Sequence, residues 1–192
     1  RSFIKSLVID DWHNLSRLYD MNLKAFLPLL LICLWLPLGC GKPAADLPQE
    51  IGLSIQPATA EQVLSAIENA EGNAVLVNIW ATWCQPCVEE FPDIMKLYQK
   101  YQDRGLRIIF VSADFENQTE AAKAFLQKQG VDFATYQKSG KDMAFINTLD
   151  ERWSGALPAT WVYDGNGNKR HFWEGKKDHA HFEKAILDVL GQ

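Results

Sequence analysis

The residues best suited to chemistry are two cysteines separated by two positions, Cys84 and Cys87. Three-residue spacing along the first turn of a helix places the two α-carbons about 5–6 Å apart, within the range that a disulfide requires. Such a pair can exchange electrons with a partner disulfide, because one thiolate attacks and the second sulfur resolves the mixed disulfide. A structural disulfide or two buried thiols are the alternatives.

The pair lies where a buried strand is expected to give way to a helix. Residues 74–80 are apolar almost throughout, which predicts a central buried strand. Apolar residues then recur every three or four positions over 88–98, and this spacing predicts a helix that begins near Cys84. The unpaired N–H groups and partial positive charge of a helix N-terminus favour a thiolate. We therefore expect Cys84 to attack and Cys87 to resolve. Pro86 is tolerated between them because first-turn N–H groups lack partners.

The rest of the chain alternates between strand and helix patterns. Thr59 to Gln62 has capping-box spacing ahead of one helix, and residues 117–120 are a second possible capping box. Asp164 to Gly167 has the composition of a hairpin turn. This order of elements predicts an α/β fold whose central sheet mixes strand directions. The other predicted strands are 51–55, 106–111, 131–137, 160–163 and 169–173. Of the other predicted helices, one begins after residue 59, one after residue 117 and one covers 143–149, and the last lies at the end of the chain and extends to residue 190.

The segment from Val77 to Cys87 resembles the active site of the thioredoxin superfamily. More narrowly, it is similar to the bacterial membrane-anchored group that includes TlpA, ResA and the cytochrome c maturation thioredoxins. The resemblance covers about residues 59–192, and its most specific motifs lie at 77–92 and 155–162. It implies a single-domain thioredoxin fold, with a central mixed β-sheet flanked by helices, and the activity of a protein-disulfide oxidoreductase.

Glu90 and Pro92 match a Glu-x-Pro pattern of that group. The resemblance implies that Glu90 handles the proton of the resolving cysteine, since Asn78 stands where cytosolic thioredoxin has a buried Asp for this task. Glu90 follows Cys87 by one helical turn, and a partly buried carboxyl has a pKa raised toward working pH. The alternative is a solvated surface carboxylate, which is what we expect of Glu89.

The sequence from Gly155 to Thr160 resembles the cis-proline loop of the superfamily. The resemblance implies that the bond before Pro158 is cis, that the loop packs against the disulfide, and that its backbone pairs with an extended substrate strand. Leu157, with Trp83 and Pro86, would then contact the substrate. A trans proline that begins a strand is the alternative. We expect Trp80 to lie in the core instead.

The N-terminal part has the layout of an export signal. Lys24 is followed by an uncharged run over 25–38 that is short for a membrane span, and then by Gly39-Cys40. The end of this run resembles a lipoprotein signal, which implies lipidation of Cys40, although Pro37 departs from the motif. Ordinary cleavage or an uncleaved anchor is the alternative. We expect 21–40 to be the signal and 41–58 a linker.

Two further expectations concern the ends of that segment. Charged residues precede the apolar run, so we expect Met21 to be the initiator and residues 1–20 to be an upstream extension outside the natural protein. The folded domain is predicted to cover 59–192. These features predict an exported, membrane-anchored protein that faces the periplasm or another extracytoplasmic space.

Composition narrows the functional classes. The net charge is −5 and there is no run of basic residues, so a nucleic acid is not an expected partner. A zinc site usually needs four Cys or His ligands. The chain has a single Cys-x-x-Cys, and His171, His179 and His181 lack metal-like partners, so no metal is expected. The sequence Asp164-Gly165-Asn166-Gly167 is not sufficient for calcium.

The sequence therefore predicts an enzyme that exchanges its Cys84–Cys87 dithiol or disulfide with protein partners and uses no other cofactor. The resemblance implies a reductant in cytochrome c maturation or in general reduction of exported thiols, supplied with electrons by a membrane protein. An oxidase or isomerase remains open, because potentials in this fold span roughly −270 to −120 mV. A Cu(I)-binding chaperone is the alternative from another class, although such relatives usually have three residues between the cysteines and a downstream His. A peroxidase uses a differently framed Cys.

Overall fold

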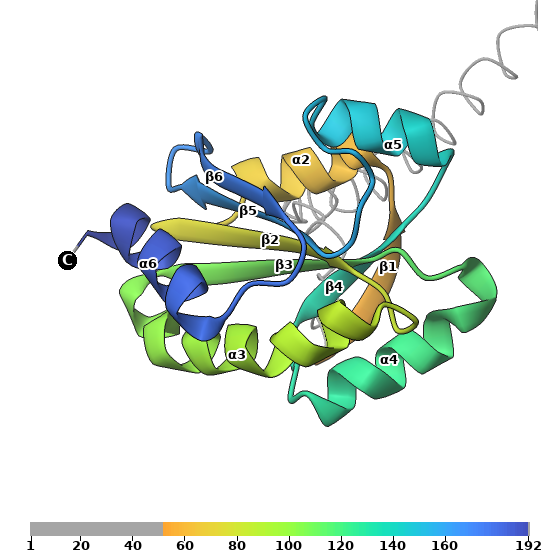
Figure 1. The fold of residues 1–192 in the computed structure, drawn as a ribbon, viewed down its shortest axis with the longest axis horizontal. Coiled ribbons are helices and arrows are strands. Elements are labelled where there is room, and N and C mark those ends of the chain that lie inside the picture. The colour runs from red at the N-terminus through yellow and green to blue at the C-terminus, as the bar shows by residue number, and fades with distance from the viewer. Residues whose placement is uncertain (1–51, 192) are drawn as a thin grey trace, which may run out of the picture. The chain divides into compact units, whose positions relative to one another are not determined.

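The computed structural model describes residues 52–191, which form a sheet of six strands in the order β1-β4-β3-β2-β5-β6 (Figure 1). The first four in this order run parallel, whereas β5 is antiparallel to β2 and β6 is antiparallel to β5. The strands are β1 (Ser54–Ala58), β2 (Ala74–Trp80), β3 (Leu106–Ser112), β4 (Ala134–Lys138), β5 (Ala159–Asp164) and β6 (Lys169–Glu174). The helices are α2 (Ala60–Glu68), α3 (Gln85–Tyr101), α4 (Thr119–Lys128), α5 (Asp142–Leu149) and α6 (His179–Leu190), with short 3-10 helices η1 (Gln102–Arg104) and η2 (Glu116–Gln118).

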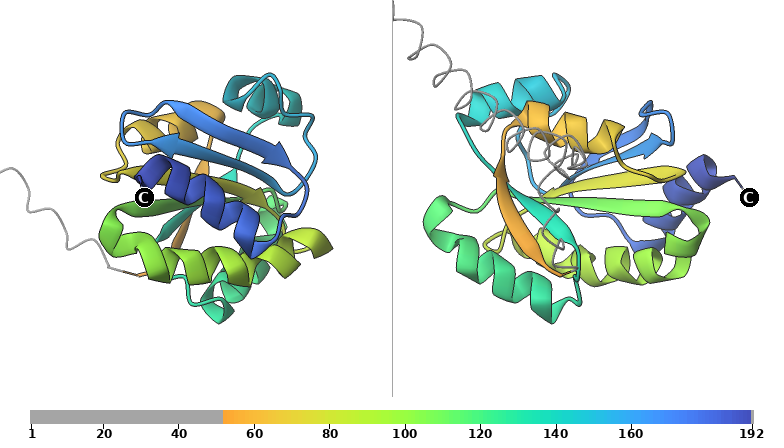
Figure 2. Two further views of the ribbon diagram at one scale, coloured as in Figure 1. Left: turned by 60° about the vertical axis from the view of Figure 1, so that its left-hand side comes forward. Right: turned by 180° about the vertical axis from the view of Figure 1, so that it is seen from behind.

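Helices cover both faces of the sheet. Helices α3, α4 and α6 pack on one face, and α2 and α5 pack on the other (Figure 2). All seven residues of β2 are buried, because β2 lies between β3 and β5 and under both helical layers. Alternate β2 side chains enter the two cores: Leu76 and Trp80 face α3, while Val77 and Ile79 face α2. The apolar run predicted as a central buried strand is therefore confirmed.

The direction of the strands decides which loops lie close together at one end of the sheet. Strands β1 to β4 are parallel, so their carboxyl ends meet at one edge, and β5 begins there. Residues that follow β2 and precede β5 are therefore brought together although they are far apart in sequence.

Two predicted strands begin three residues before the observed ones. The strand expected at 131–137 is β4, Ala134–Lys138. The strand expected at 51–55 is β1, Ser54–Ala58, and it pairs with β4, so residues 54–58 belong to the sheet and not to the predicted linker. Pro57 is accommodated because β1 is an edge strand, where a missing N–H costs no ladder bond.

The capping box expected at 117–120 does not form. Asn117 lies inside η2, and the side chain of Gln118 instead accepts a hydrogen bond from the backbone N–H of Phe115 at 3.3 Å. The capping box of Thr59 and Gln62 at the start of α2 is confirmed.

No helix within residues 52–191 is long and apolar enough to span a bilayer. The predicted signal at 21–40, the predicted lipidation site Cys40, the predicted upstream extension 1–20 and most of the predicted linker lie outside the described residues.

Candidate active site

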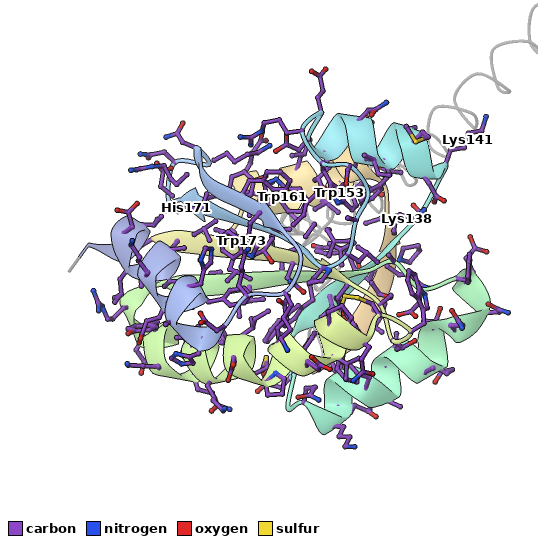
Figure 3. All side chains as sticks on the ribbon, viewed as in Figure 1. Lys138, Lys141, Trp153, Trp161, His171 and Trp173 are labelled. Atoms are coloured by element: carbon purple, nitrogen blue, oxygen red, sulfur yellow. A yellow bond between two sulfur atoms is a disulfide. The ribbon has the colours of Figure 1, made fainter. Side chains whose placement is uncertain are left out.

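Cys84 is the N-cap residue of α3, directly beyond the turn that follows β2. Its Sγ accepts the backbone N–H of Cys87 at 3.3 Å, so the sulfur occupies the position where the helix presents its unpaired donors. Cys84 and Cys87 form a disulfide, with their α-carbons 5.3 Å apart (yellow bond in Figure 3). The expected strand-to-helix placement of the pair is confirmed.

The two cysteines differ in accessibility. Cys84 keeps 6% of its surface exposed and Cys87 keeps 1%, so a partner reaches the first sulfur more readily. Trp83 is 56% exposed beside them, and Pro86 is exposed in the first turn of α3. Trp80, by contrast, is fully buried in the core, as predicted.

The turn before Cys84 is held by Asp114, which follows β3. The buried Asp114 carboxylate accepts the Thr82 N–H at 3.0 Å, the Thr82 hydroxyl at 2.6 Å and the Ser112 hydroxyl at 2.6 Å. These bonds join the end of β3 to the cysteine-bearing turn. Sequence reasoning missed Asp114, because its partner Thr82 lies 32 positions away.

Glu90 lies one turn beyond Cys87 and is 1% exposed. Its Oε1 accepts a hydrogen bond from Asn78 Nδ2 at 3.1 Å, and its Oε2 accepts one from the backbone N–H of Lys177 at 3.1 Å. Asn78 also donates to Thr160 Oγ1 at 2.9 Å, which ties the carboxyl to both β2 and β5.

Burial raises the pKa of Glu90 to about 7. The hydrogen bonds from Lys177 and Asn78 and the charges of Lys176 and Lys177 act in the opposite direction, but they do not outweigh the loss of solvation. A carboxyl with this pKa can both accept and release a proton near neutral pH. The surface alternative for Glu90 is therefore wrong, whereas Glu89 is exposed as expected.

The Leu157–Pro158 peptide bond is cis, as the resemblance implied, so the trans alternative is wrong. Leu157 packs against the apolar cluster that contains both cysteines. Gly155 has φ +90°, a backbone conformation that residues with a Cβ rarely adopt, so the conformation favours glycine there. Leu157 of the cis-proline loop, residues 155–160, thus packs against the same apolar cluster as the disulfide.

The end of α5, which precedes the cis-proline loop, is fastened to β5 and β6 through Asp150. The Asp150 carboxylate is almost fully buried and accepts hydrogen bonds from Arg152 at 2.8 Å, Lys169 at 2.7 Å and Trp161 Nε1 at 2.9 Å. Burial alone would raise the pKa of Asp150, but these hydrogen bonds lower it below its ordinary value. The carboxylate stays charged and joins the end of α5 to both strands.

The segment that begins at the last residue of β6, residues 174–178, connects the cis-proline loop to α3. On the loop side, Glu174 Oε1 accepts the Ser154 N–H at 2.6 Å, and the Gly175 N–H donates to Pro158 O at 2.8 Å. We call these five residues the 174–178 segment.

On the α3 side, the 174–178 segment contacts two successive carboxylates. Lys176 Nζ lies 2.6 Å from Glu89 Oε2, and the Lys177 N–H donates to Glu90 as described above. The segment therefore covers Glu90 and contributes to its burial. Sequence reasoning found Glu90 from its spacing to Cys87, but it missed Thr160 and Lys177, because neither partner is near Glu90 in sequence.

Residues 41–172 match the sequence model of the AhpC/TSA family. The chain belongs to this family. It is 33% identical over 102 residues to the thiol-disulfide oxidoreductase ResA of Bacillus thuringiensis. The aligned part is 53% of this chain and 54% of the relative. Identity to ResA of Oceanobacillus iheyensis is 29% over 136 residues, 69% of this chain and 65% of the relative. The chain thus spans between about half and two thirds of the length of these curated relatives.

A solved structure supports the fold assignment. The protein assigned as the thiol:disulfide interchange protein DsbE of Chlorobium tepidum superposes with a TM-score of 0.53 at 26% identity, covering 64% of this chain and 84% of that chain. The predicted thioredoxin-like fold and the resemblance to ResA-type proteins are confirmed. The roles of Cys84, Cys87, Glu90, Pro158, Trp83, Pro86 and Leu157 remain predictions that the geometry makes specific.

Proposed function

We propose that this protein is a thiol–disulfide oxidoreductase that uses Cys84 and Cys87 to reduce disulfides of protein partners. The observation that carries the proposal is a cysteine pair at the N-terminus of α3 with the buried carboxyl of Glu90 one turn behind it. The names of the ResA and DsbE relatives support the same chemistry. The protein's disulfide is the redox group, and no other cofactor enters the proposed reaction.

In the first step, the Cys84 thiolate attacks one sulfur of the partner disulfide. A Cys84–partner disulfide forms, the partner's own S–S bond breaks, and its second sulfur leaves as a thiolate. The N–H groups at the start of α3 favour the anionic sulfur before attack. The greater exposure of Cys84 supports this role.

In the second step, Glu90 accepts the proton of the Cys87 thiol. The Cys87 thiolate then attacks Cys84 Sγ, the Cys84–Cys87 disulfide forms, and the partner leaves as a dithiol after protonation. Two electrons have passed from the protein to the partner. A carboxyl with a pKa of about 7 suits this transfer, because it is partly deprotonated at working pH and can lose the proton again.

We also propose that the protein works outside the cytoplasm, held at a membrane through lipidated Cys40. The apolar run before Cys40 and the following proline-containing linker support this placement. In an oxidising compartment a membrane protein would return electrons to the Cys84–Cys87 disulfide, and cytochrome c maturation or general reduction of exported thiols would consume them.

The proposed function is tested by trapping. With Cys87→Ser the mixed disulfide cannot be resolved, so we expect covalent complexes between Cys84 and partner proteins that disappear on adding dithiothreitol. Cys84→Ser is the matched control and should trap nothing. Equal trapping by both variants, or reduction of insulin disulfides by Cys84→Ser at the wild-type rate, would refute the proposal.

The direction of electron flow is a separate measurement. The equilibrium of the Cys84–Cys87 disulfide with glutathione reports its reduction potential. A value near −270 mV fits a reductant, whereas a value near −120 mV would assign the protein to the oxidases and retain the exchange chemistry.

A further inference from the structure

Three polar side chains lie buried together one helical turn beyond the disulfide. Asn78 of β2 and Glu90 of α3 are each 1% exposed, and Thr160 of β5 is fully buried. Asn78 Nδ2 donates to Glu90 Oε1 at 3.1 Å and to Thr160 Oγ1 at 2.9 Å. Because a carboxamide nitrogen carries two hydrogens, both N–H groups of this amide are paired. Through these two bonds Thr160 is linked to Glu90 by way of Asn78.

The pairing of the strands brings Thr160 to Asn78. The two residues are direct partners in the antiparallel pairing of β2 and β5, so their side chains lie next to each other on one face of the sheet. On the neighbouring strand β6 the partner of Thr160 is Trp173, labelled in Figure 3. The ring of Trp173 packs against Phe182 of α6. The sheet therefore holds Thr160 beside Asn78 in a site that is closed to solvent.

The orientation of the Asn78 amide determines which form of Glu90 is favoured. With its NH2 group toward Glu90, Asn78 donates a hydrogen bond and stabilises the charged carboxylate. With its oxygen toward Glu90, Asn78 can only accept, which stabilises the protonated carboxyl. Burial raises the pKa of Glu90 to about 7, and the hydrogen bond from Asn78 acts against this rise. The observed orientation is thus the one that favours the charged form.

The hydroxyl of Thr160 favours this donating orientation. It accepts the second N–H of Asn78, so that neither N–H of the amide is left unpaired. A buried N–H without a partner is costlier than a carbonyl oxygen that uses one of its two lone pairs. Without the hydroxyl, the donating orientation would leave such an N–H. The balance would then move toward the orientation in which Asn78 accepts from protonated Glu90.

We propose that Thr160 is a positioning residue whose hydroxyl holds the Asn78 amide in the orientation that donates to Glu90. This inference rests on the proposed function, in which Glu90 must become charged before it can take the proton of Cys87. Thr160 acts through Asn78 and keeps a larger fraction of Glu90 ready to accept that proton near neutral pH.

The charges that act on Glu90 come from the 174–178 segment. Lys176 and Lys177 both lower the pKa of Glu90 through their charges, although burial outweighs them. Lys176 also pairs with Glu89, the neighbouring carboxylate on α3. A substitution of Thr160 removes none of these groups, so it tests the amide alone.

On α6, the titratable side chain of His181 interacts with the charge of Lys177. Burial lowers the pKa of His181 below its ordinary value of 6.5, and the charge of Lys177 acts in the same direction. His181 therefore titrates at lower pH than Glu90, whose pKa is about 7. The two titrations are distinct.

The test is a titration of Glu90 in the oxidised full chain, where Cys84 and Cys87 do not titrate. The NMR signal of a glutamate carboxyl labelled with carbon-13 reports its protonation, and Glu90→Gln identifies the signal. We expect Thr160→Val, which keeps the shape of the side chain, to raise the midpoint of the Glu90 titration by about 0.5–1 pH unit. Thr160→Ser retains the hydroxyl and should leave the midpoint at the wild-type value.

Thr135→Val is the matched control, because it also removes a buried threonine hydroxyl. Thr135 lies on β4, which is separated from β2 by β3, and its hydroxyl donates to Ser54 O at 3.1 Å. Even where it lowers stability, Thr135→Val should leave the midpoint unmoved. Asn78→Ala and the double variant Asn78→Ala/Thr160→Val should share one midpoint, because Thr160 acts through Asn78.

The inference is overturned if Thr160→Val leaves the midpoint unmoved, or if Thr160→Ser or Thr135→Val raises it as much. It is also overturned if the double variant exceeds the shift of Asn78→Ala. Thr160→Ala, which lacks the hydroxyl and fits any space left by threonine, carries the same expectation if Thr160→Val does not fold. An unmoved midpoint in that variant would equally overturn the inference.

Failure of the redox proposal is measured separately, as the rate of insulin disulfide reduction across pH. In the proposed mechanism Thr160→Val is about three- to tenfold slower than the wild type below the Glu90 midpoint and equal to it above. A raised NMR midpoint with unchanged rates would retain the orienting role of Thr160 and refute Glu90 as the proton acceptor. Absence of wild-type turnover would refute the oxidoreductase, and the titration would still decide the role of Thr160.

Discussion

Replacing Glu90 by Gln should make the protein more stable at alkaline pH and less stable at acidic pH. The pKa of Glu90 is about 7 in the folded protein and about 4.5 without burial. Between these values the folded state binds more protons than the unfolded state, so the free energy of unfolding falls as pH rises. Gln carries no charge and removes this dependence.

The magnitude follows from the pKa difference and the contacts. The shift from 4.5 to about 7 corresponds to about 3 kcal/mol of stability lost by the wild type between those pH values. Glu90 accepts hydrogen bonds on both oxygens, from Asn78 and from the Lys177 N–H, and Gln keeps one acceptor. This loss costs about 1 kcal/mol at every pH. Glu90→Gln should therefore be about 1 kcal/mol less stable than the wild type at pH 4 and about 2 kcal/mol more stable at pH 8.

Urea unfolding of the oxidised protein, followed by tryptophan fluorescence at a series of pH values, measures this crossover. The oxidised form is chosen because its cysteines do not titrate. In parallel, the variant should exchange disulfides more slowly than the wild type near neutral pH, since Cys87 loses its proton acceptor. Glu68→Gln, at an exposed position of α2, is the control and should show neither effect.

The reasoning is refuted if Glu90→Gln and the wild type depend on pH in the same way between 4.5 and 7. It is also refuted if the variant is less stable than the wild type at pH 8. An unchanged pH–rate profile alongside the expected stability change would retain the buried carboxyl and remove Glu90 from the proton transfer.

Three further substitutions test the supporting contacts. Asp150→Asn should lower the free energy of unfolding by about 3 kcal/mol at pH 7, measured by chemical denaturation, because Lys169 loses a buried charged partner. Since folding lowers the pKa of Asp150, this difference should persist down to about pH 4 and shrink only at lower pH. Asn78→Ala should raise the midpoint of the pH–rate profile, because Glu90 loses a hydrogen bond that favours its charged form; an unmoved midpoint would contradict this. Gly155→Ala should lower stability by about 1–3 kcal/mol, since alanine at φ +90° is strained, and an unaltered Tm would show that the loop adapts.

The parts of the site that sequence reasoning found are those set by local spacing. Cys84, Cys87 and Glu90 lie within two turns of one helix, so helical periodicity and the apolar strand before them were sufficient to place them. The loop at Pro158 is distant in sequence and was found through its resemblance to a known motif. The order of strand and helix patterns was similarly sufficient for a mixed sheet flanked by helices.

The remaining features depend on contacts between distant segments. Asp114, Thr160 and the backbone of Lys177 act on the site across the sheet or from the loop after β6, and no pattern in their own neighbourhood indicates this. The position of β1 was missed because Pro57 argues against a strand until its place at the sheet edge is known. The capping box at Asn117 was wrong because a competing turn uses Gln118 instead.

The 174–178 segment has a practical consequence for mutagenesis. Within five residues it binds the carbonyl of Pro158, the carboxylate of Glu89 and the carboxyl of Glu90. A substitution there disturbs the surface that meets the partner and the group that handles the proton at the same time. Kinetic defects from this segment therefore cannot be assigned to recognition or to proton transfer alone, and separating them requires substitutions made on β2, α3 or β5.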